Sequence, residues 1–308
     1  MCGIAGTSKW GDRTSIDLKN VVPLQGDVFL GVDFGGTGVK AAPVDITTGE
    51  LQAERHRIPT PQPATPEAIA GVIKQLAEHF EFKGVIGVGV PSVVRRGVVY
   101  TAANIDKTWV NINAQKLFEE ATGCPVVVLN DADAAGLAEM NFGEGRGHEE
   151  EVVLVTTFGT GIGTALYVEG KLVPNLELGH IEMDGEVAEK LASSAARERE
   201  DMSWKKWAGR VSQYLGKLER LLSPDLIIMG GGVSKKDEKF SHYLELPMGT
   251  PVVMAAMRNE AGIVGAALGA HYKYARFLAE AEADAGRPSP VNGVALASVS
   301  GSSVRTSP

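Results

Sequence analysis

The sequence is poor in cysteine and contains no long apolar run. Its 308 residues include only two cysteines, Cys2 and Cys124, which excludes a disulfide framework and a cysteine-rich zinc site. No apolar run approaches the roughly 18 residues of a membrane-spanning helix, and the N-terminal residues lack the apolar core of a signal peptide. We therefore expect a soluble, cytoplasmic protein in a reducing environment, without a membrane partner.

Positive charge is also in short supply. The 30 lysines and arginines face 38 aspartates and glutamates, so the formal net charge is −8. A surplus of negative charge opposes broad binding of nucleic acids, and we expect no nucleic-acid partner. The hydrophobic fraction of 44% and the charged fraction of 22% are ordinary for a globular protein, and the length suits one large or two medium domains.

Glycine, in contrast, is concentrated in short turns. Residues Asp33 to Lys40 read DFGGTGVK and lie between two apolar runs, a pattern typical of a strand, a glycine turn and a second strand. Bare glycine backbone lets N–H groups approach an anion closely, but an ordinary hairpin turn remains an equally good interpretation of this stretch alone. The candidate phosphate-binding residues are Gly35, Gly36, Thr37, Gly38 and Lys40, and Asp33 could hold a hydrated magnesium ion.

The same arrangement recurs in the second half of the chain. A predicted strand at 152–156 leads into the turn FGTGIG at 158–163, and a return strand follows at 164–168. Two similar hairpins in two halves predict an internally duplicated fold with a ligand between them. Gly159, Thr160 and Gly161 are the phosphate-binding candidates of this second turn.

Strands and helices alternate along the chain, which predicts an α/β fold. Thr65 and Pro66 mark a helix start, and apolar residues then recur at helical spacing as far as Phe80. The other expected elements are strands at 84–90, 126–129 and 226–229, helical stretches at 186–201 and 204–222, and a small-residue helix at 261–270.

Asn130 and Asp131 follow the buried strand 126–129, at the carboxyl end where α/β folds usually place ligands. Asp131 suits a general base, but aspartate also caps helices well, and the pattern alone leaves both interpretations open. Asp133 is the neighbouring competitor, and we interpret it as a helix cap.

The first six residues, MCGIAG, resemble the start of the N-terminal-nucleophile glutamine amidotransferases, in which removal of methionine exposes a catalytic cysteine. The glycine hairpin begins too soon afterwards to leave room for an amidotransferase domain. We therefore expect residues 1–27 to form a flexible leader in which Cys2 has no such role.

Taken in order, the motifs DFGGTGVK, NDADAAG, TFGTGIG, ELGH and GGGVS resemble the sugar-kinase branch of the ROK (repressor, open reading frame, kinase) family. PTPQPATP, TAANIDK, LNDADAAGLAE and RNEAGIVGAAL are similar to its polyphosphate/ATP-dependent glucokinases, and the resemblance runs from about residue 28 to 275. It implies a duplicated actin-like ATPase (ribonuclease-H-like) fold with two α/β domains around a cleft. The implied parts are a leader at 1–27, an N-terminal domain at 28–140 joined by a C-terminal helix at 259–279, a C-terminal domain at 141–258 and a disordered tail at 280–308.

The resemblance also implies an activity. It predicts transfer of a phosphoryl group from polyphosphate, ATP or both to glucose, with Mg²⁺ as cofactor, Asp131 as base and a homodimer as the assembly; mannose is a second candidate acceptor. An ATP-only ROK kinase for another hexose such as mannose, and a non-catalytic sugar-binding ROK regulator, are the alternatives. The family's zinc motif is missing after His180, so zinc is not expected.

The resemblance assigns further residues on both sides of the reaction. The sugar side comprises Asn104, Asn130, Asp131, Glu177, His180 and Glu189, with Glu182 as an alternative to Glu189 and Asp106 as a further candidate. On the donor side, Gly231 and Gly232 would lie along the nucleotide and Lys235 would follow them. A polyphosphate track could also use Lys236, Lys239, Lys205, Lys206 and Arg210, although a solvated helix face explains Lys205 and Lys206 equally well.

Overall fold

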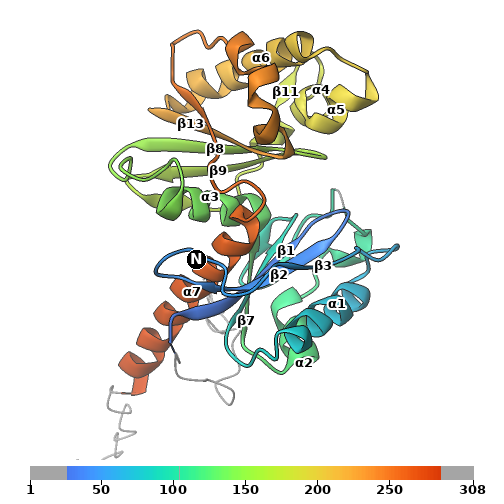
Figure 1. The fold of residues 1–308 in the computed structure, drawn as a ribbon, viewed down its shortest axis with the longest axis vertical. Coiled ribbons are helices and arrows are strands. Elements are labelled where there is room, and N and C mark those ends of the chain that lie inside the picture. Colours follow the sequence, from blue (N-terminus) through green and yellow to red (C-terminus); the bar gives the residue numbers. More distant parts are fainter. Residues whose placement is uncertain (1–25, 104, 286–308) are drawn as a thin grey trace, which may run out of the picture.

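The computed structural model describes residues 26–103 and 105–285, which form two α/β halves stacked one above the other (Figure 1). Asn104, the leader up to residue 25 and the tail from residue 286 lie outside the described residues. Within the described residues, no helix is long and apolar enough to cross a membrane.

The first half contains a five-stranded sheet in the order β3-β2-β1-β4-β7. Its first three strands pair antiparallel, whereas β1, β4 and β7 run parallel with their carboxyl ends at one edge. β4 and β7 are buried along their whole length, as expected for parallel strands covered on both faces. The strands are β1 Val28–Phe34, β2 Val39–Asp45, β3 His56–Ile58, β4 Ile86–Val90 and β7 Val126–Asn130, with a small ribbon of β5 Val94–Arg95 and β6 Val98–Val99 beside them.

The second half repeats this plan with the sheet order β10-β9-β8-β13-β14. Again an antiparallel hairpin is followed by parallel strands, so the duplication predicted from the two glycine turns is present. The strands are β8 Val152–Phe158, β9 Ile162–Val168, β10 Lys171–Val173, β13 Leu226–Gly231 and β14 Val252–Met254, with a ribbon of β11 Glu182–Met183 and β12 Glu186–Val187.

Helices cover both sheets. The predicted helix start is confirmed, because the Thr65 hydroxyl accepts a 3.3 Å hydrogen bond from the NH of Ala68 at the first turn of α1. The prediction of one helical stretch at 186–201 is wrong in part: it opens as a strand and then divides at Ser193, whose hydroxyl caps the second helix. The helices are α1 Pro66–His79, α2 Ala114–Thr122, α3 Asp131–Phe142, α4 Ala188–Ala192, α5 Ser194–Arg199, α6 Trp204–Leu222 and α7 Ala261–Ala285, with 3₁₀ turns at Lys107–Trp109, Leu178–His180, Gly232–Lys239 and Ser241–Tyr243.

Helices α3 and α7 cross where the two halves meet (Figure 1). A methyl group on Gly265 would lie 1.6 Å from the carbonyl oxygen of Ala134, so glycine permits the backbones to touch. Gly136 faces the second sheet instead, against Ala165 and Tyr167. α7 continues to Ala285, past the end expected at residue 279.

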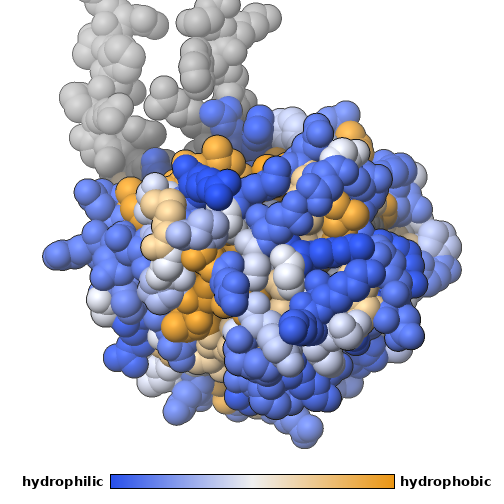
Figure 2. All heavy atoms as spheres, turned by 90° about the horizontal axis from the view of Figure 1, so that it is seen from above, coloured by the Kyte–Doolittle hydropathy of each residue, from blue (hydrophilic) through white to orange (hydrophobic). Residues whose placement is uncertain are grey.

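Aromatic side chains of α6 belong to the core, as their helical spacing predicted. Trp207 and Tyr214 are fully buried and pack edge to face on Phe158. Seen from above, the surface is mainly hydrophilic, with hydrophobic residues confined to a few patches (Figure 2).

Candidate active site

A cavity of about 200 Å³ lies where the two halves meet. The first hairpin contributes Asp33 and Lys40, and α3 contributes Asp131. Residues from the second half and from the start of α7 close it: Val155, Thr157, Gly230, Gly231, Gly232, Ala255, Arg258, Asn259, Ala261 and Gly262, together with Ala135 and Glu139 of α3. The cavity thus unites the first hairpin, the strand-end aspartate and the third glycine turn, which lie far apart in the sequence.

The first glycine turn closes the hairpin β1–β2, and its residues Gly35–Gly38 do not line this cavity. Gly35 NH donates to Gly38 O at 3.2 Å, and the Thr60 hydroxyl donates to Gly35 O at 2.6 Å. Gly36 and Thr37 are exposed at the tip. Below the turn, the Lys40 amine lies 3.1 Å from Asp33 Oδ2, so this carboxylate enters the cavity already paired with a cation.

The second glycine turn is shorter, with three residues between the paired ends of β8 and β9. Gly159 NH donates to Gly161 O at 3.0 Å, and Gly159 O accepts from Ala195 NH at 3.1 Å, which ties the turn to α5. Gly159 and Thr160 are exposed. None of the three residues lines the cavity described above.

Asn130, rather than either aspartate, caps helix α3. Its Oδ1 accepts hydrogen bonds from Ala132 NH at 2.9 Å and Asp133 NH at 3.0 Å, and its Nδ2 donates to Ser92 O at 3.2 Å. The two cap interpretations, Asp131 and Asp133, are therefore wrong. One Nδ2 hydrogen of Asn130 has no partner among the described residues and could meet a ligand.

The Asp131 carboxylate opens to the cavity at the first residue of α3. Its pKa is raised to about 7, chiefly by burial, then by the nearby charge of Asp33 and, to a smaller extent, by the charge of Glu177. A hydrogen bond of 2.8 Å from Ala132 NH opposes the shift. A carboxyl group with a pKa near neutrality is poised to take a proton.

Glu177, His180 and Glu189 form a cluster at the 3₁₀ turn after β10. His180 Nδ1 lies 3.9 Å from Glu177 Oε2, and its Nε2 lies 3.5 Å from Glu189 Oε1. Ile162 NH donates to Glu189 Oε2 at 3.2 Å, which fixes that carboxylate beside the second hairpin. Burial raises the pKa of Glu177, and the charge of Glu189 also contributes.

The structure separates the alternatives on the sugar side. Glu182 is exposed on the short strand β11, whereas Glu189 lies within 3.5 Å of the His180 ring. Asp106 accepts hydrogen bonds from the NH (2.8 Å) and hydroxyl (2.6 Å) of Thr108, and the hydroxyl bond lowers its pKa. Its carboxylate therefore caps a local turn.

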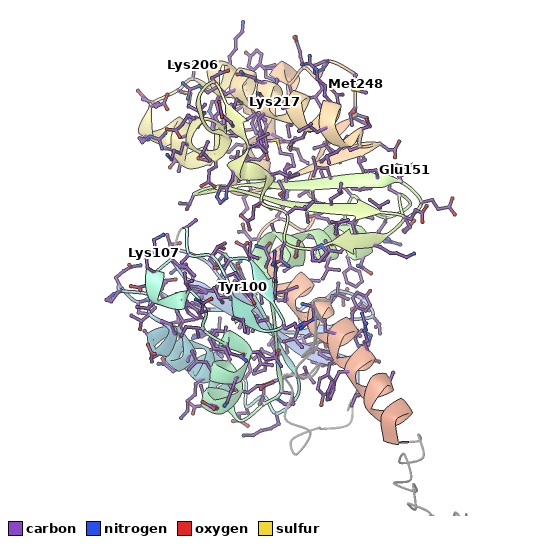
Figure 3. The ribbon with its side chains drawn as sticks, turned by 180° about the vertical axis from the view of Figure 1, so that it is seen from behind. Tyr100, Lys107, Glu151, Lys206, Lys217 and Met248 are labelled. Atoms are coloured by element: carbon purple, nitrogen blue, oxygen red, sulfur yellow. The ribbon has the colours of Figure 1, made fainter. Side chains whose placement is uncertain are left out.

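A more open cavity of about 690 Å³ adjoins the first one and shares Arg258 and Asn259 with it. Lys235 lines it together with Arg55, so one lysine of the predicted track faces this space. The other proposed cations do not line either cavity: Arg210 pairs with Glu200 at 2.8 Å, and Figure 3 shows Lys206 at the outer end of the second half.

Three residues of this region had no assigned role in the sequence. Arg258 and Asn259 stood inside the family motif RNEAGIVGAAL but precede its helix, and only the structure brings them to both cavities. Glu139 is 1% exposed, and its carboxylate accepts hydrogen bonds from the NH groups of Ala256 at 3.1 Å and Met257 at 2.8 Å. The burial of Glu139 is visible only in the structure.

The carboxylates present fit a hydrated magnesium ion. Mg²⁺ usually keeps several waters and binds through one or two carboxylates plus phosphates, and Asp33 and Asp131 are the two aspartates that share the cavity. Among the described residues, no group of three histidine, cysteine or acidic side chains forms a complete metal cage.

Comparisons with known proteins give the family. The model of the ROK family matches residues 29–202. A polyphosphate glucokinase of Mycobacterium tuberculosis is 48% identical over 240 residues, which cover 78% of this chain and 89% of that protein. A glucokinase of Streptomyces coelicolor is 32% identical, covering 78% and 76%.

Solved structures agree. The inorganic polyphosphate/ATP-glucomannokinase from Arthrobacter sp. strain KM is 47% identical with a TM-score of 0.75, covering 80% of this chain and 99% of that one. A ROK family glucokinase from Streptomyces griseus, solved with glucose and AMPPNP, is 26% identical with a TM-score of 0.67, covering 80% and 99%. The predicted actin-like α/β fold is thereby confirmed. The chain belongs to the ROK family.

Proposed function

We propose that this protein is a kinase that phosphorylates glucose to glucose 6-phosphate, with inorganic polyphosphate, ATP or both as donor. The observation that carries the proposal is the cavity in which Asp131, with its pKa raised to about 7, meets Asp33, Lys40 and the Gly230–Gly232 turn. The names of relatives at 45–48% identity, all polyphosphate glucokinases, support the same activity.

The acceptor side orients the sugar. Glu177 and Glu189 offer carboxylates and His180 offers ring nitrogens to sugar hydroxyls, and Asn130 adds an amide hydrogen. Hydrogen bonds to carboxylates belong to the stronger class. Asn104 belongs to the same proposed set, although it lies outside the described residues. A sugar held there places its 6-hydroxyl beside Asp131.

The reaction then needs one proton transfer and one displacement. The Asp131 carboxylate takes the proton of the 6-hydroxyl as the sugar oxygen bonds to the terminal phosphorus of the donor. The bond from that phosphorus to the bridging oxygen breaks, and the shortened polyphosphate or ADP leaves. The raised pKa of Asp131 lets it hold this proton near neutral pH.

The donor phosphates lie along the first turn and the start of α7. The Lys40 amine and the positive end of the α7 dipole at Ala261 and Gly262 line this side of the cavity, and the turn Gly35–Gly38 joins the two strands next to Asp33 and Lys40. The second turn, Gly159–Gly161, contacts the donor if the halves close further. Gly231 and Gly232 border the nucleotide, and Lys235 continues the positive surface outward.

Magnesium, when bound at Asp33 through water, would supply charge neutralisation on the transferring phosphoryl group. Asp33 is already held by Lys40 at 3.1 Å, so its position is fixed before the ion arrives. We also propose a division into domains at 28–140 with α7, and 141–258. A homodimer, mannose as a second acceptor and a cytoplasmic location stay predictions.

One assay tests the proposal. Glucose and mannose are each offered with ATP and with polyphosphate in separate arms, and formation of the 6-phosphate is coupled to a dehydrogenase or measured by phosphate transfer. Product from glucose with polyphosphate is expected. Activity with mannose and ATP alone would favour the other-hexose kinase, and sugar binding without product in any arm would favour a non-catalytic regulator.

A further inference from the structure

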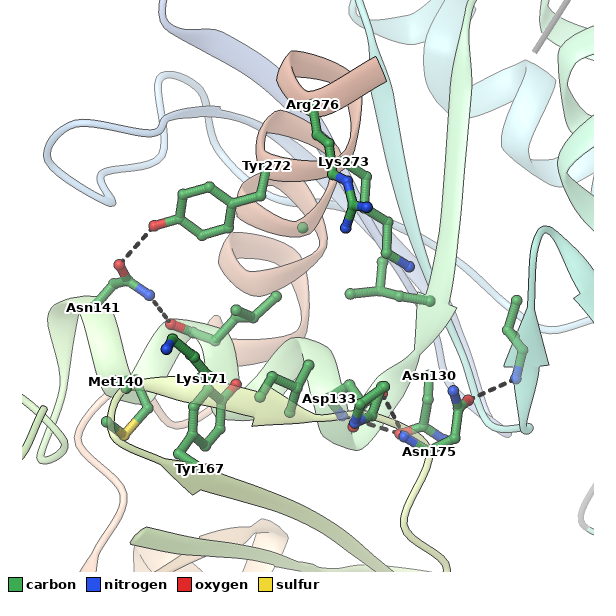
Figure 4. A pocket seen from close by; sticks show the side chains of 17 residues that line it. Asn130, Asp133, Met140, Asn141, Tyr167, Lys171, Asn175, Tyr272, Lys273 and Arg276 are labelled. Carbon is green, nitrogen blue, oxygen red and sulfur yellow. Dashed lines mark hydrogen bonds between the residues drawn. The ribbon is translucent and has the colours of Figure 1, made fainter. Parts of the chain in front are cut away.

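A third cavity, of about 540 Å³, lies on a different face of α3 from the 200 Å³ cavity of the candidate active site, which we call the donor cavity. Asp131, Ala135 and Glu139 face the donor cavity at helical spacing, whereas Asp133 and Leu137 face the third cavity. Figure 4 shows residues of α7 on one side of it and Tyr167 with Lys171 on the other. We call this space the hinge cavity; its lining comprises Val94, Leu129, Asn130, Asp133, Leu137, Met140, Asn141, Tyr167, Gly170, Lys171, Leu172, Pro174, Asn175, Gly269, Tyr272, Lys273 and Arg276.

Two buried polar atoms in its wall lack a partner among the described residues. Asp133 is 2% exposed; its Oδ2 accepts from Asn175 NH at 2.9 Å, but its Oδ1 has no hydrogen bond. Tyr167 is 1% exposed, and its hydroxyl is also without a partner. Buried polar atoms are nearly always satisfied, so water or a ligand is expected at this wall.

The charges on the lining are mostly positive. Lys171, Lys273 and Arg276 line the cavity, and Asp133 is the one acidic residue among them. The Lys273 amine lies 3.4 Å from Val128 O; burial lowers its pKa, and the negative charge of Asp133 opposes this effect by favouring the charged form.

Most of the remaining wall is apolar. Leu129, Leu137, Met140 and Leu172 face the same space as the cations. A small-molecule site typically combines such an apolar wall with a few placed polar groups. An inorganic ion would leave this wall unused, whereas a compound with a ring or chain would cover it.

We propose that the hinge cavity binds a small organic anion, a phosphate ester or a carboxylate with an apolar body. Its charged group lies at Lys171, Lys273 and Arg276, and a hydroxyl or amine reaches Asp133 and Tyr167. Such a ligand would contact both halves, because Asp133 lies on α3 of the first half and Asn175 belongs to the second half.

Calorimetric titration of the full chain tests the site without using catalysis. Phenyl phosphate and benzoate serve as the two probes, with saturating Mg-ATP and no sugar, so that the donor cavity is filled. At least one probe should bind with one-to-one stoichiometry, and the tighter of the two identifies the head group. Inorganic phosphate and phenol, which each lack one half of the chemistry, should bind at least tenfold more weakly.

Variants locate the binding. Lys171 is exposed on β10, and Lys171→Glu should weaken the probe at least tenfold, while Tyr167→Phe, which keeps the ring, should weaken it several-fold. Lys83→Glu, an exposed lysine outside the cavity, should leave the affinity unchanged. If neither probe binds beside ATP, or if Lys171→Glu leaves the affinity intact, the proposal is overturned. Because no turnover is measured, its failure is distinct from failure of the kinase assay.

Discussion

Asp133 accepts a 2.9 Å hydrogen bond from the main-chain NH of Asn175, and this bond joins the two halves of the molecule beside the candidate active site. The Asn175 side chain also accepts from Val94 NH at 2.8 Å (Figure 4). Asn175 adopts a φ of +60°, in the left-handed region that asparagine tolerates better than most residues. The loop that leads to Glu177 is therefore fixed against the helix that begins with Asp131.

Asn175→Ala should raise the KM for glucose about tenfold and lower the melting temperature. The change removes the acceptor for Val94 NH and strains a left-handed residue, so Glu177 loses its fixed position. Asn111→Ala is the matched control, because Asn111 has a φ of +67° but is exposed in the first half. Equal KM values in the two variants would show that the contacts of Asn175 do not position the sugar site.

Asp131→Asn should lower kcat by about 10²- to 10⁴-fold, the usual contribution of a general base. The amide is isosteric with the carboxyl and can still accept from Ala132 NH, so the fold and sugar binding should persist. Coupled assays give kcat, and tryptophan fluorescence gives glucose affinity. Asp201→Asn, an exposed residue with a φ of +46°, is the control. Near-normal turnover of Asp131→Asn would refute the assignment.

The pH dependence of kcat/KM should reflect the ionisation of the Asp131 carboxyl group. Its pKa of about 7 means that the protonated form, which cannot take a proton, predominates at lower pH; kcat/KM should fall about tenfold per pH unit below the midpoint. Asp33→Asn removes a negative neighbour that raises this pKa, so the midpoint should move to lower pH. Profiles of both proteins with one donor, each scaled to its plateau, give the shift. An unmoved midpoint would contradict the predicted coupling.

Glu189→Gln should raise the KM for glucose about 10- to 100-fold with a smaller effect on kcat. A hydrogen bond to a charged group contributes about 1.5–3 kcal/mol, and the amide keeps the size of the side chain. Glu182→Gln tests the residue that the sequence left as the alternative; it is exposed and should leave the KM within twofold. A larger rise of the KM in Glu182→Gln than in Glu189→Gln would assign the sugar contact to Glu182 instead.

Gly265→Ala should destabilise the protein by about 3 kcal/mol, because the added methyl group would lie 1.6 Å from Ala134 O and force α3 and α7 apart. Gly209→Ala on the exposed face of α6 meets nothing within 4 Å and should stabilise by up to about 1 kcal/mol through helix propensity. Urea unfolding gives both values. A tolerated Gly265→Ala would show that the helices separate easily.

Local patterns in the sequence predicted much of the fold. Apolar runs located the core strands, helical spacing located α1 and α6, and the repeated glycine turn predicted the duplication. Each pattern reflects interactions between residues close in the chain. The stretch 186–201 failed because its composition suits a helix, while Ser193 offers the backbone a cap that divides it.

The sequence by itself determined the family, the α/β duplication and Asp131 at a strand end, because each depends on motifs of a few consecutive residues. Only the tertiary structure decided that Asn130 is the cap, that Glu189 rather than Glu182 meets His180, and that Glu139 holds the loop before Arg258. Those contacts join residues brought together by the crossing of α3 and α7 and by the packing of two sheets. No local pattern encodes which distant side chain will lie within hydrogen-bonding distance.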